Sequence, residues 1–239
     1  MVAMPKIPEI SVVIPAINEE HYITEVLDAL DRQSFKDFET IVVDGGSSDR
    51  TAEIAAKHAR VVIQLKRGMS LARNTGSRAA RGRILLFLDA DTVPSHDLLS
   101  AYSKAFSDDR VVAATGPLEP LEKTSLFVRF AYMLEAIYLT RLSFMLGRPA
   151  ISACNFAVRK DAFDRVHGFD EKLLTYEGHD LSGRLRAHGR FVYVSGARVK
   201  TSVRRVAKWG VRRYVAYRVK NTLRIHLTGK PYSEYDTVR

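Results

Sequence analysis

The chain has 239 residues, 46% of them hydrophobic, and a net charge of +10. This length suits one large domain or a domain with an appendage, and the hydrophobic fraction excludes the disordered and collagen-like classes. Cys154 is the single cysteine, so an internal disulfide and a cysteine-rich structural zinc site are excluded. A lone thiol fits a reducing compartment, and we expect Cys154 to be a small buried residue.

The positive charge is concentrated at the C-terminal end. Residues 181–239 contain 15 lysines and arginines and two acidic residues, whereas residues 1–180 contain 22 basic and 25 acidic residues. Such a basic block usually faces a polyanion, either a membrane surface or a nucleic acid. No known nucleic-acid motif accompanies the charge, so nucleic acid is the less favoured partner.

Targeting and membrane-spanning segments are not indicated by the pattern. No apolar stretch of signal-peptide length precedes the first strand-like run, and no segment reaches the roughly 18 uncharged apolar residues of a spanning helix. We therefore expect a cytoplasmic protein that lies, at most, peripherally on the inner face of the membrane.

Strands and helices alternate along the first half of the chain. Short β-branched or apolar runs predict strands at 10–14, 39–43, 61–65, 83–88 and 111–116. Apolar residues at helical spacing, or helix-start signals, predict helices at 19–33, 50–58, 70–80 and 97–107. Ser48 or Asp49 is expected to cap the second of these helices. Unbroken apolar strands that alternate with helices predict an α/β fold whose mostly parallel sheet is covered on both faces.

The second half of the chain is less regular. We expect an apolar helix at 124–146, a strand at 151–158, helices at 160–166 and 179–188, a strand at 192–194 and a basic helix or helix pair over 203–227, with a possible break at Gly210. A helix that is apolar almost all round, such as 124–146, is either buried or lies against lipid. We expect one domain over 1–200 and a basic helical extension over 201–239.

Three polar clusters follow the predicted strands directly. Their sequences are Pro15-Ala16-Ile17-Asn18-Glu19, Asp44-Gly45-Gly46 and Asp89-Ala90-Asp91. In open parallel sheets, ligands bind outside the carboxyl ends of the strands, so these clusters are expected to meet at one site. The first cluster lacks the G-x-G-x-x-G pattern of dinucleotide-binding folds, which disfavours a nicotinamide-dependent oxidoreductase.

Asp89 and Asp91 are the candidate metal ligands. A buried strand that delivers two carboxylates one residue apart gathers negative charge, which is costly unless a cation or hydrogen bonds compensate it. Mg²⁺ or Mn²⁺ does so, and such ions also bridge substrate phosphates. The alternative is a surface turn with two solvated aspartates, and the convergence of the clusters favours the metal.

Two further features are ambiguous when taken alone. Asp44 could accept hydrogen bonds from a nucleobase or ribose, but an aspartate followed by two glycines also suits an Asx turn. Arg67, Gly68 and Arg73 lie near a helix start, where arginines and an exposed helix N-terminus suit an anionic diphosphate. They are equally compatible with a capped helix carrying solvated cations.

Several segments together resemble glycosyltransferase family 2. They are, in order, Ser11–Glu20, Val42–Thr51, Ala72–Gly76, Leu86–Thr92, Asn155–Glu171 and Glu177–Leu185. Each is weak alone, but six in register over about residues 10–205 are specific. The resemblance implies a GT-A (Rossmann-like) fold, a divalent metal, a nucleoside-diphosphate sugar as donor and inversion at the anomeric carbon.

The resemblance also implies roles for individual residues. Those implied to line the nucleoside pocket or lie near it are Pro15, Ala16, Asn18, Glu19, Asp44, Gly68 and Arg73. Asp89 would contact ribose or metal, Ala90 lies between the two aspartates, and Asp91 would bind the metal. The stretch Thr201–Arg205 resembles one in membrane-linked members, where Arg204 and Arg205 would reach the diphosphate or a lipid phosphate.

The chain departs from the family pattern at Gly178. The family often has an aspartate there that serves as the base, and a glycine cannot accept a proton from an acceptor hydroxyl. Either Glu177 or Asp180 replaces it, since both lie within a helical turn, or the acceptor is a phosphate that needs no base, or the enzyme is impaired. His179 is a further candidate, although a loop histidine more often caps or is solvated.

Residues beyond 203 form the candidate surface for a membrane. Val211, Val215, Val219, Leu223 and Leu227 repeat every four residues beside basic flanks. This pattern suits a helix on anionic lipid, and it equally suits a helix packed on the catalytic domain with a solvated basic face.

The function expected from the sequence is an inverting glycosyltransferase that uses Mg²⁺ or Mn²⁺ and a nucleoside-diphosphate sugar. The expected acceptor is a glycan or a lipid-linked acceptor such as a polyprenyl phosphate. Two alternatives remain. A nucleotidyltransferase would want a glycine-rich, lysine-bearing loop after the first strand, which is missing, and a basic binding protein without catalysis is suggested by Gly178.

Overall fold

The computed structural model describes residues 6–64, 66–126, 128–129, 151–214, 216–217, 220 and 224. Within these residues, the main sheet has seven strands in the order β3-β2-β1-β4-β8-β6-β9. The strands are β1 (Ile10–Ala16), β2 (Phe38–Asp44), β3 (Arg60–Ile63), β4 (Ile84–Leu88), β6 (Val111–Thr115), β8 (Asn155–Arg159) and β9 (Arg190–Tyr193). Only β8 runs antiparallel to its neighbours, so the sheet is mostly parallel, as predicted.

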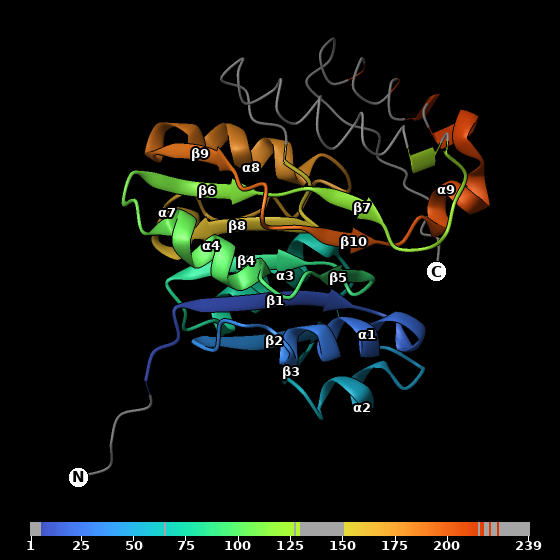
Figure 1. Cartoon of the computed structure of the whole chain (residues 1–239), viewed down its shortest axis with the longest axis horizontal. Coiled ribbons are helices and arrows are strands. Elements are labelled where there is room, and N and C mark those ends of the chain that lie inside the picture. Colours follow the sequence, from blue (N-terminus) through green and yellow to red (C-terminus); the bar gives the residue numbers. More distant parts are fainter. Residues whose placement is uncertain are drawn as a thin grey trace.

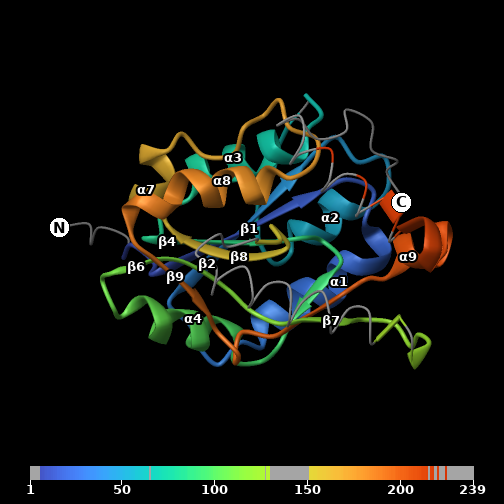
Figure 2. The same cartoon turned by 90° about the horizontal axis from the view of Figure 1, so that it is seen from above.

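Helices cover both faces of this sheet (Figures 1 and 2). On one face lie α1 (Glu20–Asp31), α2 (Thr51–Ala55) and α4 (Leu98–Phe106), and on the other α3 (Met69–Ala79), α7 (Lys160–Arg165) and α8 (Glu177–Leu185). Successive residues of a strand point to opposite faces, so Val12 packs in the core under α1 and Val13 in the core under α3. Both faces of β1 are therefore buried, which explains its unbroken apolar sequence.

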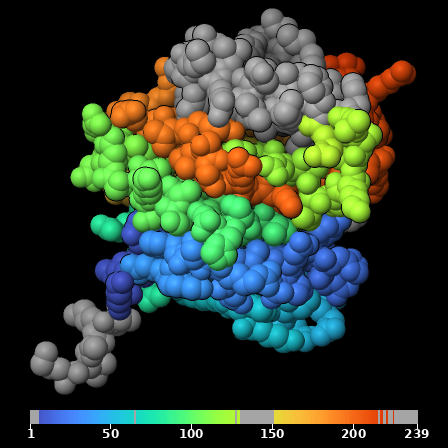
Figure 3. All heavy atoms as spheres, viewed as in Figure 1, coloured from blue at the N-terminus to red at the C-terminus, as the bar shows by residue number. Residues whose placement is uncertain are grey.

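A small second sheet lies beside the carboxyl ends of the main strands. Its strands are β5 (Thr92–Pro94), β7 (Leu118–Pro120) and β10 (Val199–Thr201), with β10 in the middle. The helix α9 (Arg204–Trp209) follows directly and lies beyond the end of β1 (Figure 1). At that end of the molecule, the surface of α9 adjoins the surface around β7 (Figure 3). The chain thus returns to the sheet edge where the polar clusters are.

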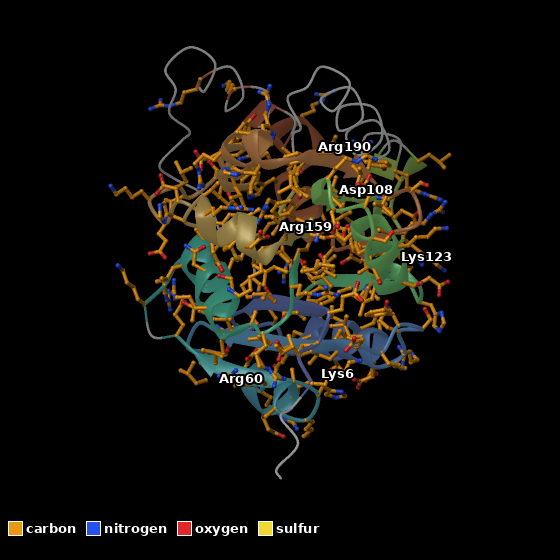
Figure 4. The ribbon with its side chains drawn as sticks, turned by 90° about the vertical axis from the view of Figure 1, so that its left-hand side faces the viewer. Lys6, Arg60, Asp108, Lys123, Arg159 and Arg190 are labelled. Atoms are coloured by element: carbon orange, nitrogen blue, oxygen red, sulfur yellow. The ribbon has the colours of Figure 1, made fainter. Side chains whose placement is uncertain are left out.

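Charged side chains link neighbouring strands at the opposite end of the sheet, near the amino end of β6. Asp108, just before β6, pairs with Arg110 at 2.9 Å and with Arg190 at 3.3 Å. The guanidinium of Arg159 donates to the backbone oxygen of Asp108 at 3.1 Å (Figure 4). This cluster joins β6, β8 and β9 at the amino end of β6 and is separate from the polar clusters.

Several predicted boundaries were wrong by a few residues. The strand predicted at 151–158 begins only at Asn155, because residues 151–154 turn back and the amide of Asn155 donates to the oxygen of Ser152 at 3.4 Å. The helix predicted at 179–188 begins at Glu177, and its last turn, Arg186–His188, is a 3₁₀ helix. The cap position of α2 is Arg50, although Oδ1 of Asp49 accepts the amide of Thr51 at 2.9 Å.

The C-terminal predictions are covered only in part. Gly210 ends α9 with φ of 76°, so the break predicted there is confirmed. Most of the apolar segment 124–146, and Val215, Val219, Leu223 and Leu227 of the predicted stripe, lie outside the described residues. No helix among the described residues combines the length and apolarity needed to cross a bilayer. The domain boundary at 200 stays a prediction, although Thr201 is part of β10.

Candidate active site

The carboxyl ends of β1, β2 and β4 bring the predicted clusters to one edge. The register pairs Ala16 with Asp44, and the amide of Gly45 donates to the oxygen of Ala16 at 2.8 Å. Pro15 and Ala16 are buried in the last two positions of β1. The loops after β1 and β2 are therefore held side by side by backbone pairing.

Asn18 and Asp44 shape these two loops. Asn18 has φ of 54°, and its side-chain oxygen accepts the amide of Ser48 at 2.8 Å. The carboxylate of Asp44 is buried and accepts the amides of Gly46 at 3.1 Å and Ser47 at 3.0 Å. This is the Asx turn that the two glycines suggested. A role of Asp44 toward a nucleoside stays a prediction.

Asp89 and Asp91 follow β4 at the centre of this edge. Their side chains are 32% and 14% exposed, and Ala90 between them is buried. The backbone oxygen of Asp89 accepts the amide of Thr92 at 3.0 Å, and that of Asp91 accepts the amide of Ser202 at 3.2 Å. One turn and one long-range backbone hydrogen bond, from the C-terminal part of the chain, thus hold the pair in place.

A buried arginine bridges Asp89 to the helix α8. Arg73, on α3, donates to Oδ1 of Asp89 at 2.8 Å and to Oε1 of Glu177 at 2.9 Å, and only 3% of its side chain is exposed. Burial of one cation is tolerable here because two carboxylates surround it. The guanidinium of Arg73 thus binds carboxylates of the protein itself. Gly68 is the N-cap of α3 and lies at the start of that helix.

A second arginine holds Asp91. Arg204, at the start of α9, donates to both carboxylate oxygens of Glu19, at 2.8 and 2.7 Å, and lies 3.1 Å from Oδ2 of Asp91. Its guanidinium carbon lies 4.9 Å from the ring centre of Tyr22. Arg204 was predicted from the sequence to reach a phosphate, whereas Tyr22 was not predicted, because it lies in α1, whose pattern is that of an ordinary amphipathic helix.

Burial, together with neighbouring carboxylates, changes the acidity of Asp91. Burial raises the pKa of Asp91 to about 7, the charges of Asp89 and Glu19 act in the same direction, and Arg204 opposes them. Carboxylates this close together are stabilised by added positive charge. The atoms that Asp89 and Asp91 offer to a cation are carboxylate oxygens. Carboxylate oxygens are the ligands that Mg²⁺ and Mn²⁺ prefer, so Asp89 and Asp91 fit a divalent cation.

The two candidate bases lie on α8 and have different partners. Glu177 is linked to Asp89 through Arg73, whereas Asp180 pairs with Arg184, one turn along its own helix, at 2.5 Å. The ring of His179 lies 4.2 Å from that of Tyr176. Gly178 is buried, and a Cβ there would lie 2.5 Å from the backbone oxygen of Ile151. The backbone of Ile151 therefore occupies the space that a side chain at position 178 would need.

Another acidic group lies elsewhere. Asp28 and Asp31, near the end of α1, and His58, after α2, have ligand atoms within 4.8 Å of one another. His58 Nδ1 already lies 2.6 Å from Asp31 Oδ2. This group is at the opposite end of α1 from Glu19 and was not predicted; no sequence motif joins its members.

The family assignment follows from comparison with known sequences. A family profile described as "Glycosyl transferase family 2" matches residues 11–166, from β1 to α7. The chain belongs to this family. It is 44% identical over 91 residues to the uncharacterized glycosyltransferase EpsJ of Bacillus subtilis. That match covers 36% of this chain and 26% of EpsJ, so the matched part spans about a quarter of that relative.

Solved structures show the same fold. TarS residues 1–349 of S. aureus, in complex with UDP-GlcNAc, has a TM-score of 0.66 at 21% identity, covering 91% of this chain and 66% of that one. The mannosyltransferase PcManGT of Pyrobaculum calidifontis, in complex with GDP-Man and Mn²⁺, has a TM-score of 0.67 at 23% identity, covering 89% of this chain and 60% of that one. The fold of this family 2 chain is therefore GT-A.

Proposed function

We propose that the chain is an inverting glycosyltransferase that transfers a sugar from a nucleoside-diphosphate sugar to an acceptor. Family membership supports the reaction class. The observation that carries the proposal is the arrangement at the end of β4, where Asp89 and Asp91 lie between two arginines and next to a candidate base. A nucleotidyltransferase is disfavoured because the family match covers these same strands.

The donor half uses the edge formed by β1, β2 and β4. Pro15, Ala16, Asn18 and Asp44 line the nucleoside end in this proposal, and the arginines at 204 and 205 bind the diphosphate. A divalent cation on Asp89 and Asp91, Mg²⁺ or Mn²⁺, would neutralise negative charge on the leaving diphosphate. The complexes of TarS with UDP-GlcNAc and of PcManGT with GDP-Man and Mn²⁺ make uridine and guanosine donors the first to test.

The acceptor half uses Glu177. An acceptor hydroxyl oxygen attacks the anomeric carbon, the bond from that carbon to the diphosphate oxygen breaks, and the hydroxyl proton passes to Glu177. Arg73 contacts Oε1 of Glu177, and Oε2 is the atom that we assign to accept the proton. Asp180 is less suited, because Arg73 links Glu177 to Asp89 at the end of β4, whereas Asp180 pairs with Arg184 of its own helix. An acceptor phosphate would make this base unnecessary.

Release of nucleoside diphosphate from UDP- and GDP-sugars tests the proposed class. With Mn²⁺ we expect slow hydrolysis by the protein alone, faster turnover with a suitable acceptor, and loss of both in EDTA. If the protein shows neither turnover nor metal-dependent nucleotide binding, it is instead a basic binding protein that lacks catalysis.

Glu177→Gln separates the two acceptor classes. With a hydroxyl acceptor, the loss of the base should lower kcat by about 10²–10⁴-fold. With a polyprenyl-phosphate acceptor, kcat should change little. Because Glu177 also contacts Arg73, nucleotide affinity is measured alongside to show that the donor site is intact.

We further propose a cytoplasmic protein that contacts the membrane peripherally through its basic extension. Trp209 has Arg213 over its ring at 5.4 Å, and Lys208 and Arg212 lie on the same segment. Val211 packs against a small apolar cluster of Val128, Val203 and Val206, so this part of the predicted stripe faces protein. Flotation with anionic but not with neutral liposomes is the expected result, and no flotation on either would leave a docked helix.

A further inference from the structure

The guanidinium of Arg204 lies where positive charge is needed at the candidate metal site. It binds Glu19 through two hydrogen bonds and lies 3.1 Å from Oδ2 of Asp91. All three side chains are largely buried, with exposed fractions of 23%, 10% and 14%. A cation of the protein itself therefore offsets negative charge at Asp91.

This contact conflicts with two other uses of the same atoms. A divalent cation on Asp91 would lie beside the guanidinium, and like charges in a poorly solvated site repel strongly. A diphosphate bound by Arg204 would likewise compete with Glu19 and Asp91 for the same guanidinium, which donates two hydrogen bonds to Glu19 and forms an ion pair with Asp91. A metal and a diphosphate would thus each favour movement of Arg204 away from Asp91.

We propose that Arg204 is an exchangeable internal counter-ion that makes metal binding and diphosphate binding interdependent; this rests on the proposed function. The metal replaces Arg204 on Asp91, and the released guanidinium is taken up by the diphosphate, for which arginine is well suited. Each ligand lowers the cost of binding the other, which is a positive coupling between them.

The residues around Arg204 suit a short movement of its side chain from one partner to another. Glu122 accepts the amide of Val203 at 2.8 Å and a hydrogen bond from the hydroxyl of Ser202, so the chain before α9 is anchored. Tyr22, whose ring lies under the guanidinium, also donates to Glu122 at 3.5 Å. The backbone can stay in place while the side chain of Arg204 changes partners.

The test is the affinity for Mn²⁺ alone, measured by calorimetry or by electron paramagnetic resonance without nucleotide. Arg204→Gln should bind Mn²⁺ about tenfold more tightly than the wild type, because no internal cation competes. The same variant should bind UDP or GDP, in saturating Mn²⁺, about tenfold more weakly. A residue that only binds donor would leave the first affinity unchanged, so these opposite signs are specific to the exchange.

Two variants separate exchange from a general effect of charge. Arg205→Gln removes the same charge from the next residue, whose field also reaches Asp91, and should change Mn²⁺ affinity less than about threefold. Tyr22→Leu changes no charge but removes the ring beneath Arg204, and should tighten Mn²⁺ binding by about two- to fivefold. Arg204→Lys, which keeps the charge, replaces Arg204→Gln in this test if that variant is unstable. Its Mn²⁺ affinity should lie between those of Arg204→Gln and the wild type.

The proposal is overturned if Arg204→Gln binds Mn²⁺ alone no more tightly than the wild type. It is also overturned if Arg204→Gln and Arg205→Gln tighten Mn²⁺ binding equally, because the loss of one positive charge would then explain both results. If the wild type binds neither UDP nor GDP with Mn²⁺, the proposed function fails instead, and the Mn²⁺ affinities of the variants still report on the exchange.

Discussion

Single residues at the active site carry its charge balance. Asp89, Asp91, Glu19 and Glu177 are gathered at one sheet edge, and two arginines from distant parts of the chain compensate them. Arg73 is the more deeply buried and joins the donor side to the candidate base. The stability of the fold and the geometry of the site therefore depend on the same side chain.

Arg73→Gln should destabilise the protein by about 3–5 kcal/mol, because it leaves Asp89 and Glu177 near each other without their cation. Urea unfolding measures this loss. Arg81→Gln is the matched control: Arg81 also binds a carboxylate, that of Glu39, but is 51% exposed, so the loss should stay below about 1 kcal/mol. Equal losses for the two variants would contradict the role of burial.

Cys154 should be unreactive in the folded protein. Burial raises the pKa of its thiol to about 12, with the charge of Asp89 acting in the same direction. At pH 8 the reactive thiolate is then about a thousandfold scarcer than for an ordinary cysteine. Thiol titration should be very slow in native buffer and fast in denaturant. Rapid labelling of the native protein would show that the 151–154 turn opens easily.

At the scale of elements, α8 packs closely against the 151–154 turn at Gly178, where the sequence resemblance implied a base. The turn at 151–154 brings the oxygen of Ile151 against Gly178, so α8 packs there through backbone contact. Gly183, in the same helix, is exposed, and a Cβ there would meet no atom within 4 Å. The two glycines provide a direct comparison within one element.

Gly178→Ala should lower stability by about 1–3 kcal/mol through overpacking, whereas Gly183→Ala should raise it by about 0.5–1 kcal/mol through helix propensity. For a chain of this length, each kcal/mol shifts the melting temperature by about 2–4 °C. Gly178→Asp should likewise fail to restore an efficient base. A stable, more active Gly178→Asp variant would mean that the turn yields readily.

The elements predicted best are those with a long apolar pattern, such as β1, β2, β4 and α1. The strands of the small sheet, β5, β7 and β10, have three residues each and are too short for a periodicity to show. The position of Asp89 and Asp91 at the sheet edge could be predicted because they follow a buried strand, and their role stays a prediction. The contacts of Arg73 with Glu177 and of Arg204 with Glu19 were not, because 104 and 185 residues separate the partners.

At the scale of the whole molecule, the two edges of the sheet differ in kind. The edge before β6 is held by the arginines around Asp108, whose contacts are satisfied within the protein. The opposite edge gathers loops from β1, β2 and β4 together with β10 and α9 from the C-terminal part. Ligand binding at that edge would therefore involve both ends of the chain.

The affinity for UDP and GDP, measured by calorimetry in Mn²⁺ and in EDTA, tests the donor site most directly. We predict that the wild type binds at least one of them only with Mn²⁺, and that Asp91→Asn weakens this binding at least about tenfold. Asp109→Asn, at an exposed carboxylate next to Asp108, should bind as the wild type does. Equal nucleotide binding in EDTA, or unchanged binding by Asp91→Asn, would contradict a metal-dependent donor site at the end of β4.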